Sequence, residues 1–384
     1  MMPAPVSVQQ RPARRTLRSI VGLYNAGVSE AAARVIVVAG ALMQPLWVPA
    51  AELASRLARL SAMSDLQVAE ADEAPRLPQA LPRELAHDRW LRKLPAMRGV
   101  AIAPGAMSAV RQLARFHGDL SGWLLEPAHF HLAKDHLVLV AGATHDLTES
   151  DARQLADAVV PLLEEELFNL QVLGPATWLL TPREQPLQVE SASFEAAAGR
   201  NVDGYLPTGN QARRYRKLLN EVQMSWHEHA VNQRREESGK LPINSIWLSG
   251  PVTWDALAAW REACEEGGCE IDETLLEARL RDDRQAWLDA LQALDARLAE
   301  CLTQSEPRAV LLCGDRDCRW LQRGSGVAGL RRMLQGGGMD SLARRLGSLL
   351  GALHSTRTDA ARHRGPGGRA DRLTAMFTEG AAGA

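Results

Sequence analysis

Lysine is scarce in this chain of 384 residues: only four of its 44 basic residues are lysines. Long apolar runs are also missing, because no stretch reaches the roughly 18 uninterrupted apolar residues typical of a membrane-spanning helix. The sequence contains neither a Walker phosphate-binding loop nor a G-x-S-x-G motif. These absences argue against an integral membrane protein, a P-loop nucleotide hydrolase and a serine hydrolase of the nucleophile-elbow type.

Cysteine is present at only five positions, Cys264, Cys269, Cys301, Cys313 and Cys318. Four of them form two C-x4-C pairs, a spacing wider than that of the usual zinc sites. The odd total, without a secretory signal sequence, indicates reduced thiols and a cytoplasmic location. We therefore expect no structural zinc and no disulfide framework.

The formal net charge of −2 is distributed unevenly along the chain. Residues 1–20 carry +4, residues 21–60 carry +1 and residues 321–384 carry +6, which leaves −13 on residues 61–320. A nucleic-acid reader usually shows a basic face on its folded domain. An acidic body with basic ends thus predicts no nucleic-acid partner.

Short apolar runs alternate with helical patterns, which predicts an α/β fold with a mixed or mostly parallel sheet flanked by helices. Two apolar runs, 243–248 and 309–313, have the character of buried strands central to a sheet. Thr148 and Asp151 have the spacing of a helix cap. Further runs predict the remaining elements: strands at 122–125, 136–140 and 176–180, and helices at 49–60, 148–170, 253–263 and 283–303.

Composition divides the chain into three parts. Residues 1–60 read as a divergent, partly ordered N-terminal segment, and residues 61–320 as the α/β body. Residues 321–384 are rich in glycine and arginine, as in linkers, and predict a poorly ordered tail.

A basic segment stands out within the acidic body. Residues 198–240 hold eight cationic and five acidic side chains. Thr208 and Gln211 have capping-box spacing and predict a helix start. Leu218, Val222 and Trp226 then form an apolar stripe, beside which Arg213, Arg216 and Lys217 share a face. A helix start beside clustered arginines suits an anion, whereas the alternative is an ordinary solvated helix face.

The block from Gly199 to Gly250 resembles the RpfE-type regulatory proteins of proteobacteria. The resemblance lies in two runs, DGYLPTGNQ at 203–211 and LPINSIWLSG at 241–250. It extends to Gly122-Trp123-Leu124, to 129–139 and to LCGDR at 312–316, and covers roughly residues 80–320. The resemblance implies a regulatory role.

A narrower block is similar to archaeal-type, cofactor-independent phosphoglycerate mutases. It comprises HAVN at 229–232, Arg235 and GKLPIN at 239–244 ahead of an apolar strand. This similarity implies an alkaline-phosphatase-like α/β core, a phosphosugar-like anion near Arg235 and Asn244, and two divalent metals such as Mn²⁺. The chain departs from that family at Ser249-Gly250, and it shows no early strand that ends in Asp-Gly beside a hydroxyl nucleophile.

These observations together predict a cytoplasmic regulatory protein that is related to phosphoglycerate mutase but lacks the metal centre. Its expected partner is a small phosphorylated or carboxylated ligand, or another protein. The alternatives are an active metal-dependent mutase or phosphatase and a scaffold without a small ligand. Two sets of residues are candidates. The anion-binding set is Arg200, Asn201, Asp203, Arg213, Arg216, Lys217, His229, Asn232, Arg235 and Asn244, and the strand-end set is Asp315 and Arg316.

Overall fold

The computed structural model describes residues 34–43, 48–63, 66–70, 81–184, 187–267, 269–303 and 308–323. Within these residues the strands form two main sheets and a small hairpin. The predicted α/β class is confirmed, although the strands are divided between two sheets. Among the described helices, none is long and apolar enough to cross a membrane.

The first sheet, sheet A, is mixed. Its strand order is β2-β11-β10-β1-β9. β1 lies between β10 and β9 and runs parallel to both, whereas β11 is antiparallel to β10 and to β2. The bounds of these strands are β1 Arg34–Val38, β2 Leu66–Glu70, β9 Cys269–Asp272, β10 Arg308–Cys313 and β11 Cys318–Arg323.

The second sheet, sheet B, is antiparallel, with the order β6-β7-β3-β8. Its strands are β3 Gly122–Ala128, β6 Phe168–Gly174, β7 Thr177–Pro182 and β8 Ser245–Val252. The prediction that the runs at 243–248 and 309–313 are both central strands was wrong for the first. Among the described strands β8 pairs only with β3, and its side chains are buried because helices cover it. β4 (Phe130–Leu132) and β5 (Leu137–Leu139) form the small hairpin.

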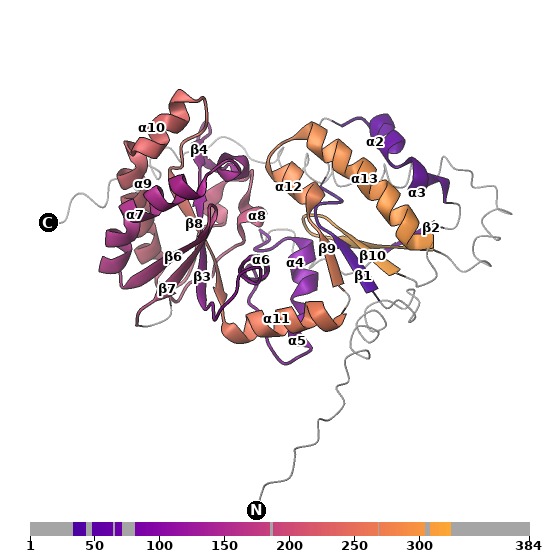
Figure 1. Ribbon diagram of the computed structural model, residues 1–384, viewed down its shortest axis with the longest axis horizontal. Helices are drawn as coiled ribbons and strands as arrows, with labels where there is room; N and C mark the ends of the chain where they lie inside the picture. The colour runs from indigo at the N-terminus through magenta and orange to yellow at the C-terminus, as the bar shows by residue number, and fades with distance from the viewer. Residues whose placement is uncertain are drawn as a thin grey trace, which may run out of the picture.

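Helices separate and cover the two sheets (Figure 1). The outer face of sheet A is covered by α2 (Ala50–Arg56), α3 (Ala58–Ala62), α12 (Thr274–Leu280) and α13 (Arg284–Thr303). The space between the sheets holds α4 (Ala86–Leu91), α5 (Lys93–Ala96), α6 (Met107–Leu113) and α11 (Trp254–Gly267). The far side of sheet B carries α7 (Glu149–Glu165), α9 (Ala212–His227) and α10 (Ala230–Glu237).

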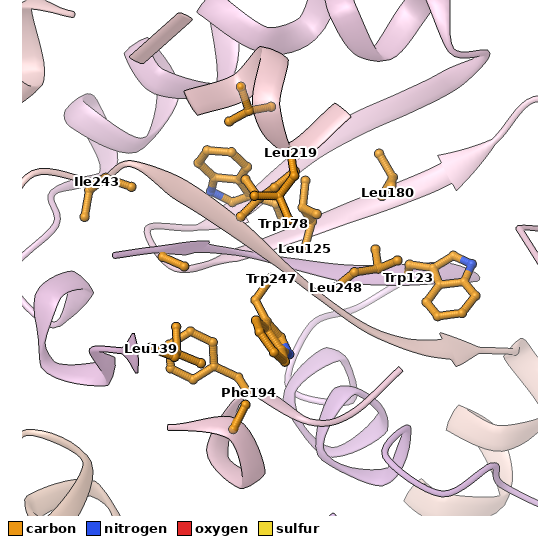
Figure 2. Close-up of a cluster of buried hydrophobic side chains, with 14 of the residues drawn as sticks. Trp123, Leu125, Leu139, Trp178, Leu180, Phe194, Leu219, Ile243, Trp247 and Leu248 are labelled. Atoms are coloured by element: carbon orange, nitrogen blue, oxygen red, sulfur yellow. The ribbon is translucent and has the colours of Figure 1, made fainter. Parts of the chain in front are cut away.

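The apolar pattern explains this layering. Successive strand side chains point to opposite faces. Val35 and Val37 of β1 therefore pack in the core between the sheets, whereas Ile36 and Val38 pack in the outer core. In sheet B, the core reaches both sides of β8. Leu219 and Trp178 lie on one side of this strand, and Trp247 and Phe194 lie on the other (Figure 2).

Several local predictions hold. Asp151 donates its backbone N–H to the Thr148 side chain at the start of α7, and the stripe that includes Leu218 forms the buried face of α9. The predicted capping box at Thr208 was wrong. Helix α9 begins at Ala212 after Gln211, whose side chain accepts a hydrogen bond from the backbone of Gln188. Thr208 instead forms a β-bridge with Glu190, and this pairing takes it away from the helix start.

The described residues between 34 and 63 belong to the same packed body as the later residues. β1 pairs with β9 and β10, and Leu53 of α2 and Leu60 of α3 pack against the residues of α13. The boundary expected at residue 60 thus runs through one packed layer. Most of the predicted tail, residues 324–384, lies outside the described residues.

Candidate functional site

The carboxyl ends of three parallel strands meet at one edge of sheet A. β1, β9 and β10 end at Val38, Asp272 and Cys313, and the chain continues there into Ala39-Gly40, Glu273 and Gly314-Asp315. This edge is where open α/β sheets usually hold ligands. Of the two strand-end candidates, Asp315 is half-buried at this edge and Arg316 is exposed.

Arg200 and Asp315 form an ion pair at this edge. Nη2 of Arg200 lies 2.6 Å from Oδ2 of Asp315, and its Nη1 donates to the Tyr205 hydroxyl at 2.9 Å. Burial disfavours the charged guanidinium, but Asp315 and Tyr205 outweigh it and raise the pKa of Arg200. Oδ1 of Asp315 is buried and has no hydrogen-bond partner within the described residues.

Helix α4 packs against the turn that carries Asp315. The backbone N–H of Ala86 donates to Gly314 O at 3.4 Å, and Arg89 donates to the carbonyl of Arg316. The turn also holds Asp317, which pairs with Arg319 at 3.2 Å. Arg89 and Arg200 thus contact a turn that itself holds Asp315 and Arg316. We name this set the strand-end site.

A buried charged cluster lies behind the strand-end site, centred on Arg111 of α6. Nε of Arg111 is 2.7 Å from Oδ1 of Asp88, and the side chains are 3% and 0% exposed. The same guanidinium contacts Glu273, and its Nη2 lies 3.7 Å from Oε1 of Glu195 in α8 (Phe194–Ala197). His87 places Nε2 3.0 Å from Arg111, and burial lowers the pKa of this imidazole. A neutral His87 ring can accept that hydrogen bond.

A hydrogen-bonded path leads from this cluster into sheet B. Glu195 accepts from the Ser108 hydroxyl at 2.8 Å, and Gln112 donates to Glu126 of β3 at 3.3 Å. The Ser249 hydroxyl of β8 donates to the other Glu126 oxygen at 3.3 Å. Burial, followed by the charge of Glu195, raises the pKa of Glu126 well above its usual value. Burial and the charge of Asp88 likewise raise the pKa of Glu195.

The residues at this edge do not fit a two-metal centre. Hard divalent cations need several free carboxylates, with imidazoles where the metal is softer. Each of Asp272, Glu273 and Asp315 is paired with an arginine, Arg297, Arg111 and Arg200 respectively. Among the described residues, no group of three or more His, Cys, Asp or Glu side chains could hold a metal ion.

The structure uses three of the predicted anion-binding residues to hold the backbone. The Asn232 side chain donates to Trp226 O and Ile243 O and accepts from Ile243 N, each at 2.8 Å. Asn244 exchanges two hydrogen bonds with the backbone of Phe130, at 2.8 and 3.0 Å. Arg235 donates to Leu241 O at 2.8 Å and to Ala143 O at 2.6 Å, and it pairs with Asp146 at 3.0 Å.

The remaining candidates occupy two different places. His229 caps α10 by accepting from Val231 N at 3.2 Å, and Asn201 accepts from Asp203 N at 3.0 Å. Arg213, Arg216 and Lys217 are exposed on α9, on the far side of sheet B (Figure 1). The structure thus joins Arg200 to Asp315 but does not bring the α9 cations to the strand-end site. The anion-binding role of the α9 cations and of Asn232, Arg235 and Asn244 stays a prediction.

The buried cluster around Arg111 was not identified from the sequence. A signal was present, because Arg111 lies within the run Ala106–Leu113, whose buried side chains are otherwise mainly small or apolar. A buried arginine requires carboxylate partners. Its partners come from α4, α8 and the start of α12, so their identity depends on the fold.

Comparison with known proteins links the chain to one enzyme group. It is 34% identical over 126 residues to a 2,3-bisphosphoglycerate-independent phosphoglycerate mutase of Methanosarcina barkeri, which is 33% of this chain and 32% of that protein. It is 37% identical over 116 residues, or 30% of this chain and 29% of the other, to a probable enzyme of the same name from Geobacter sulfurreducens. The chain thus spans about a third of the length of the curated relatives it matches. No protein-family model matches.

Two solved structures are similar to the chain at 12% identity. A cofactor-independent phosphoglycerate mutase from Thermoplasma acidophilum has a TM-score of 0.30, with coverage of 76% of this chain and 90% of that one. A protein from Pyrococcus horikoshii has a TM-score of 0.36, with coverage of 82% and 97%. The sequence matches, rather than these scores, carry the conclusion: the chain is distantly related to the cofactor-independent phosphoglycerate mutases.

Proposed function

We propose that this chain is a phosphoglycerate-mutase-like regulatory protein, which binds a small phosphorylated or carboxylated anion at the strand-end site and performs no two-metal phosphoryl transfer. The observation that carries the proposal is the pairing of each carboxylate at this edge, Asp272, Glu273 and Asp315, with an arginine. The regulatory role rests on the RpfE-type resemblance of residues 199–250.

Charge and position support an anionic ligand. Arg89 and Arg200 contact the turn that holds Arg316. Its two carboxylates, Asp315 and Asp317, pair with Arg200 and Arg319. Guanidinium groups bind phosphate and carboxylate through two parallel hydrogen bonds, and such charge-assisted bonds are stronger than neutral ones. Arg316 is exposed and reaches a ligand without breaking a buried contact. We expect it to make the first contact.

A thermal-shift titration with 3-phosphoglycerate tests the proposal. We expect the ligand to raise the Tm of the wild type, and Arg316→Ala to weaken binding by about ten-fold, since one charge-assisted contact contributes roughly 1.5–3 kcal/mol. Arg216→Ala is the matched control, because Arg216 is also an exposed arginine but belongs to α9, on the far side of sheet B. Equal shifts in both variants would exclude the strand-end site.

An active mutase is the second candidate, favoured by the 34% identity over 126 residues to an enzyme of that name. A coupled assay on 3-phosphoglycerate with added Mn²⁺ separates the two. We expect no turnover, whereas turnover that depends on Mn²⁺ would overturn the regulatory proposal. A protein partner or a scaffold role is favoured if neither 3-phosphoglycerate nor inorganic phosphate changes the Tm.

A further inference from the structure

Two cysteines face each other across the hairpin that carries Asp315. Cys313 ends β10, Cys318 begins β11, and the two are directly opposite in the antiparallel register. Their sulfur atoms lie 2.9 Å apart. Both side chains are buried in the core between the sheets, at 0% and 1% exposure.

The backbone around the pair suits a cross-strand disulfide. Gly314 N donates to Asp317 O at 2.9 Å, so residues 314 and 317 are a hydrogen-bonded pair next to the turn. Because such pairs alternate along an antiparallel ladder, Cys313 and Cys318 occupy a non-hydrogen-bonded pair, in which Cα atoms are about 4.5 Å apart and side chains are closest. That spacing is within the range of roughly 4.4–6.8 Å that a disulfide spans between Cα atoms.

We propose that Cys313 and Cys318 are an oxidation site, at which a peroxide converts the two thiols into a reversible disulfide. One sulfur, as thiolate, attacks a peroxide oxygen and breaks the O–O bond. With hydrogen peroxide, the products of this step are water and a sulfenic acid. The second sulfur attacks the sulfenic sulfur, forms the S–S bond and releases the second water. Both thiols are oxidised and the peroxide is reduced. Two molecules of a small thiol then restore the protein thiols by exchange and leave as their own disulfide.

The burial of the two thiols makes the first oxidation step slow, and their proximity favours a disulfide as the product. Burial, followed by the Cys318 thiol, raises the pKa of Cys313 well above its usual value, so little thiolate is present and the first step is slow. A small peroxide reaches the pair more readily than a bulky disulfide does. Once a sulfenic acid forms, its partner is already in contact with it. Disulfide formation then outruns further oxidation to the sulfinic acid.

The location gives the oxidation a consequence for the neighbouring turn. Residues 314–317 connect the two cysteines and include Asp315 and Arg316 of the strand-end site. A disulfide would close this short loop and restrict its opening, while the sheet register stays unchanged because the strands are already paired. This inference concerns a covalent site and stands whether or not an anion binds.

Peptide mapping of the full chain provides the test. Folded protein is treated with hydrogen peroxide, blocked with iodoacetamide and digested with trypsin without reductant. Cleavage after Arg308, Arg316 and Arg319 yields residues 309–316 and 317–319 as separate peptides. We expect these peptides to appear joined, about 2 Da lighter than the sum of the reduced pair, and to separate again in dithiothreitol.

Variants control for other thiols and for folding. Cys264→Ser with Cys301→Ser should leave the linked peptide unchanged, whereas Cys318→Ala should abolish it and let dimedone trap a sulfenic acid on Cys313. A Tm measurement of Cys318→Ala shows whether that variant folds, and the wild-type map tests the proposal by itself. Sulfinic acid on Cys313 in the wild type would overturn the proposal. So would a pair that stays reduced while Cys264 is oxidised, or one that joins only in urea.

Discussion

Nε of Arg111 lies 2.7 Å from Oδ1 of Asp88, and both side chains are almost completely buried between the two sheets. This pair joins α6 to α4, and Glu273 and Glu195 extend it to α12 and α8. A buried arginine among several carboxylates holds four segments that are distant in sequence. We therefore expect the cluster to contribute mainly to the way the two sheets are held together.

Replacing Arg111 tests this role. Arg111→Met should lower the free energy of unfolding by about 3–5 kcal/mol, because Asp88 is left buried without its arginine partner. Arg115→Met is the control, since Arg115 pairs with the same Glu273 but is 60% exposed. Its expected loss is below about 1 kcal/mol. Urea unfolding followed by tryptophan fluorescence measures both, and similar losses would contradict the assigned role of the buried pair.

The raised pKa of Glu126 predicts a pH dependence of stability. The folded chain retains a proton on this buried carboxyl that the unfolded chain releases near its usual pKa of about 4.3. Since the folded state then binds more protons, the contribution of Glu126 to the free energy of unfolding falls as pH rises above that value. Glu126→Gln removes this titration, keeps an acceptor for Gln112 and allows contact with Ser249.

The expected result is a variant that is more stable than the wild type at about pH 8 and similar to it near pH 4. Urea midpoints at a series of pH values give the difference directly. Glu164→Gln, an exposed carboxylate of α7 that pairs with Arg183, is the control and should follow the wild type. Parallel curves for Glu126→Gln and the wild type would show that Glu126 ionises normally.

A variant of Asn232 tests whether this side chain holds the backbone or contacts a ligand. Its side chain makes three hydrogen bonds of 2.8 Å to Trp226 and Ile243 and is 2% exposed. Asn232→Ala should cost about 2–4 kcal/mol, because it leaves buried backbone groups unpaired. Gln233→Ala, next in the chain and exposed, should cost less than about 0.5 kcal/mol. A normal urea midpoint with lost ligand binding would instead support the predicted anion role.

The sequence was informative where the signal is local. Thr148 marked the start of α7, and the apolar run at 309–313 marked β10, which ends at Cys313 two residues before Asp315. Helical spacing around Leu291 and Leu298 indicated α13. These features depend on residues a few positions apart, so periodicity and capping chemistry are sufficient to find them.

The pairing of strands that are distant in the sequence could not be predicted from such local patterns. The runs at 245–252 and 308–313 are similarly apolar, yet they belong to different sheets, because β10 pairs with β1 and β8 pairs with β3. The same limit affected the site. Arg235 has the chemistry of an anion-binding residue, but the fold brings the carbonyls of Leu241 and Ala143 to its donors.

The basic face of α9 provides the last prediction. Arg213 and Arg216 are exposed, whereas the neighbouring Lys217 pairs with Glu166 at 3.0 Å and Glu221 at 3.5 Å. Exposed charges of this kind contribute little to stability. Arg213→Ala and Arg216→Ala should therefore each change the free energy of unfolding by no more than about 0.5 kcal/mol.

The same variants decide whether this face binds an anion. If it is only solvated, each variant should show the wild-type thermal shift with 3-phosphoglycerate. If it is a ligand site, each should lose about ten-fold in affinity, and the wild-type shift should weaken as salt increases, because exposed charges are screened. Arg316→Ala in the same titration locates the site. Loss in Arg316→Ala alone favours the end of β10, and loss in Arg216→Ala alone moves the site to α9.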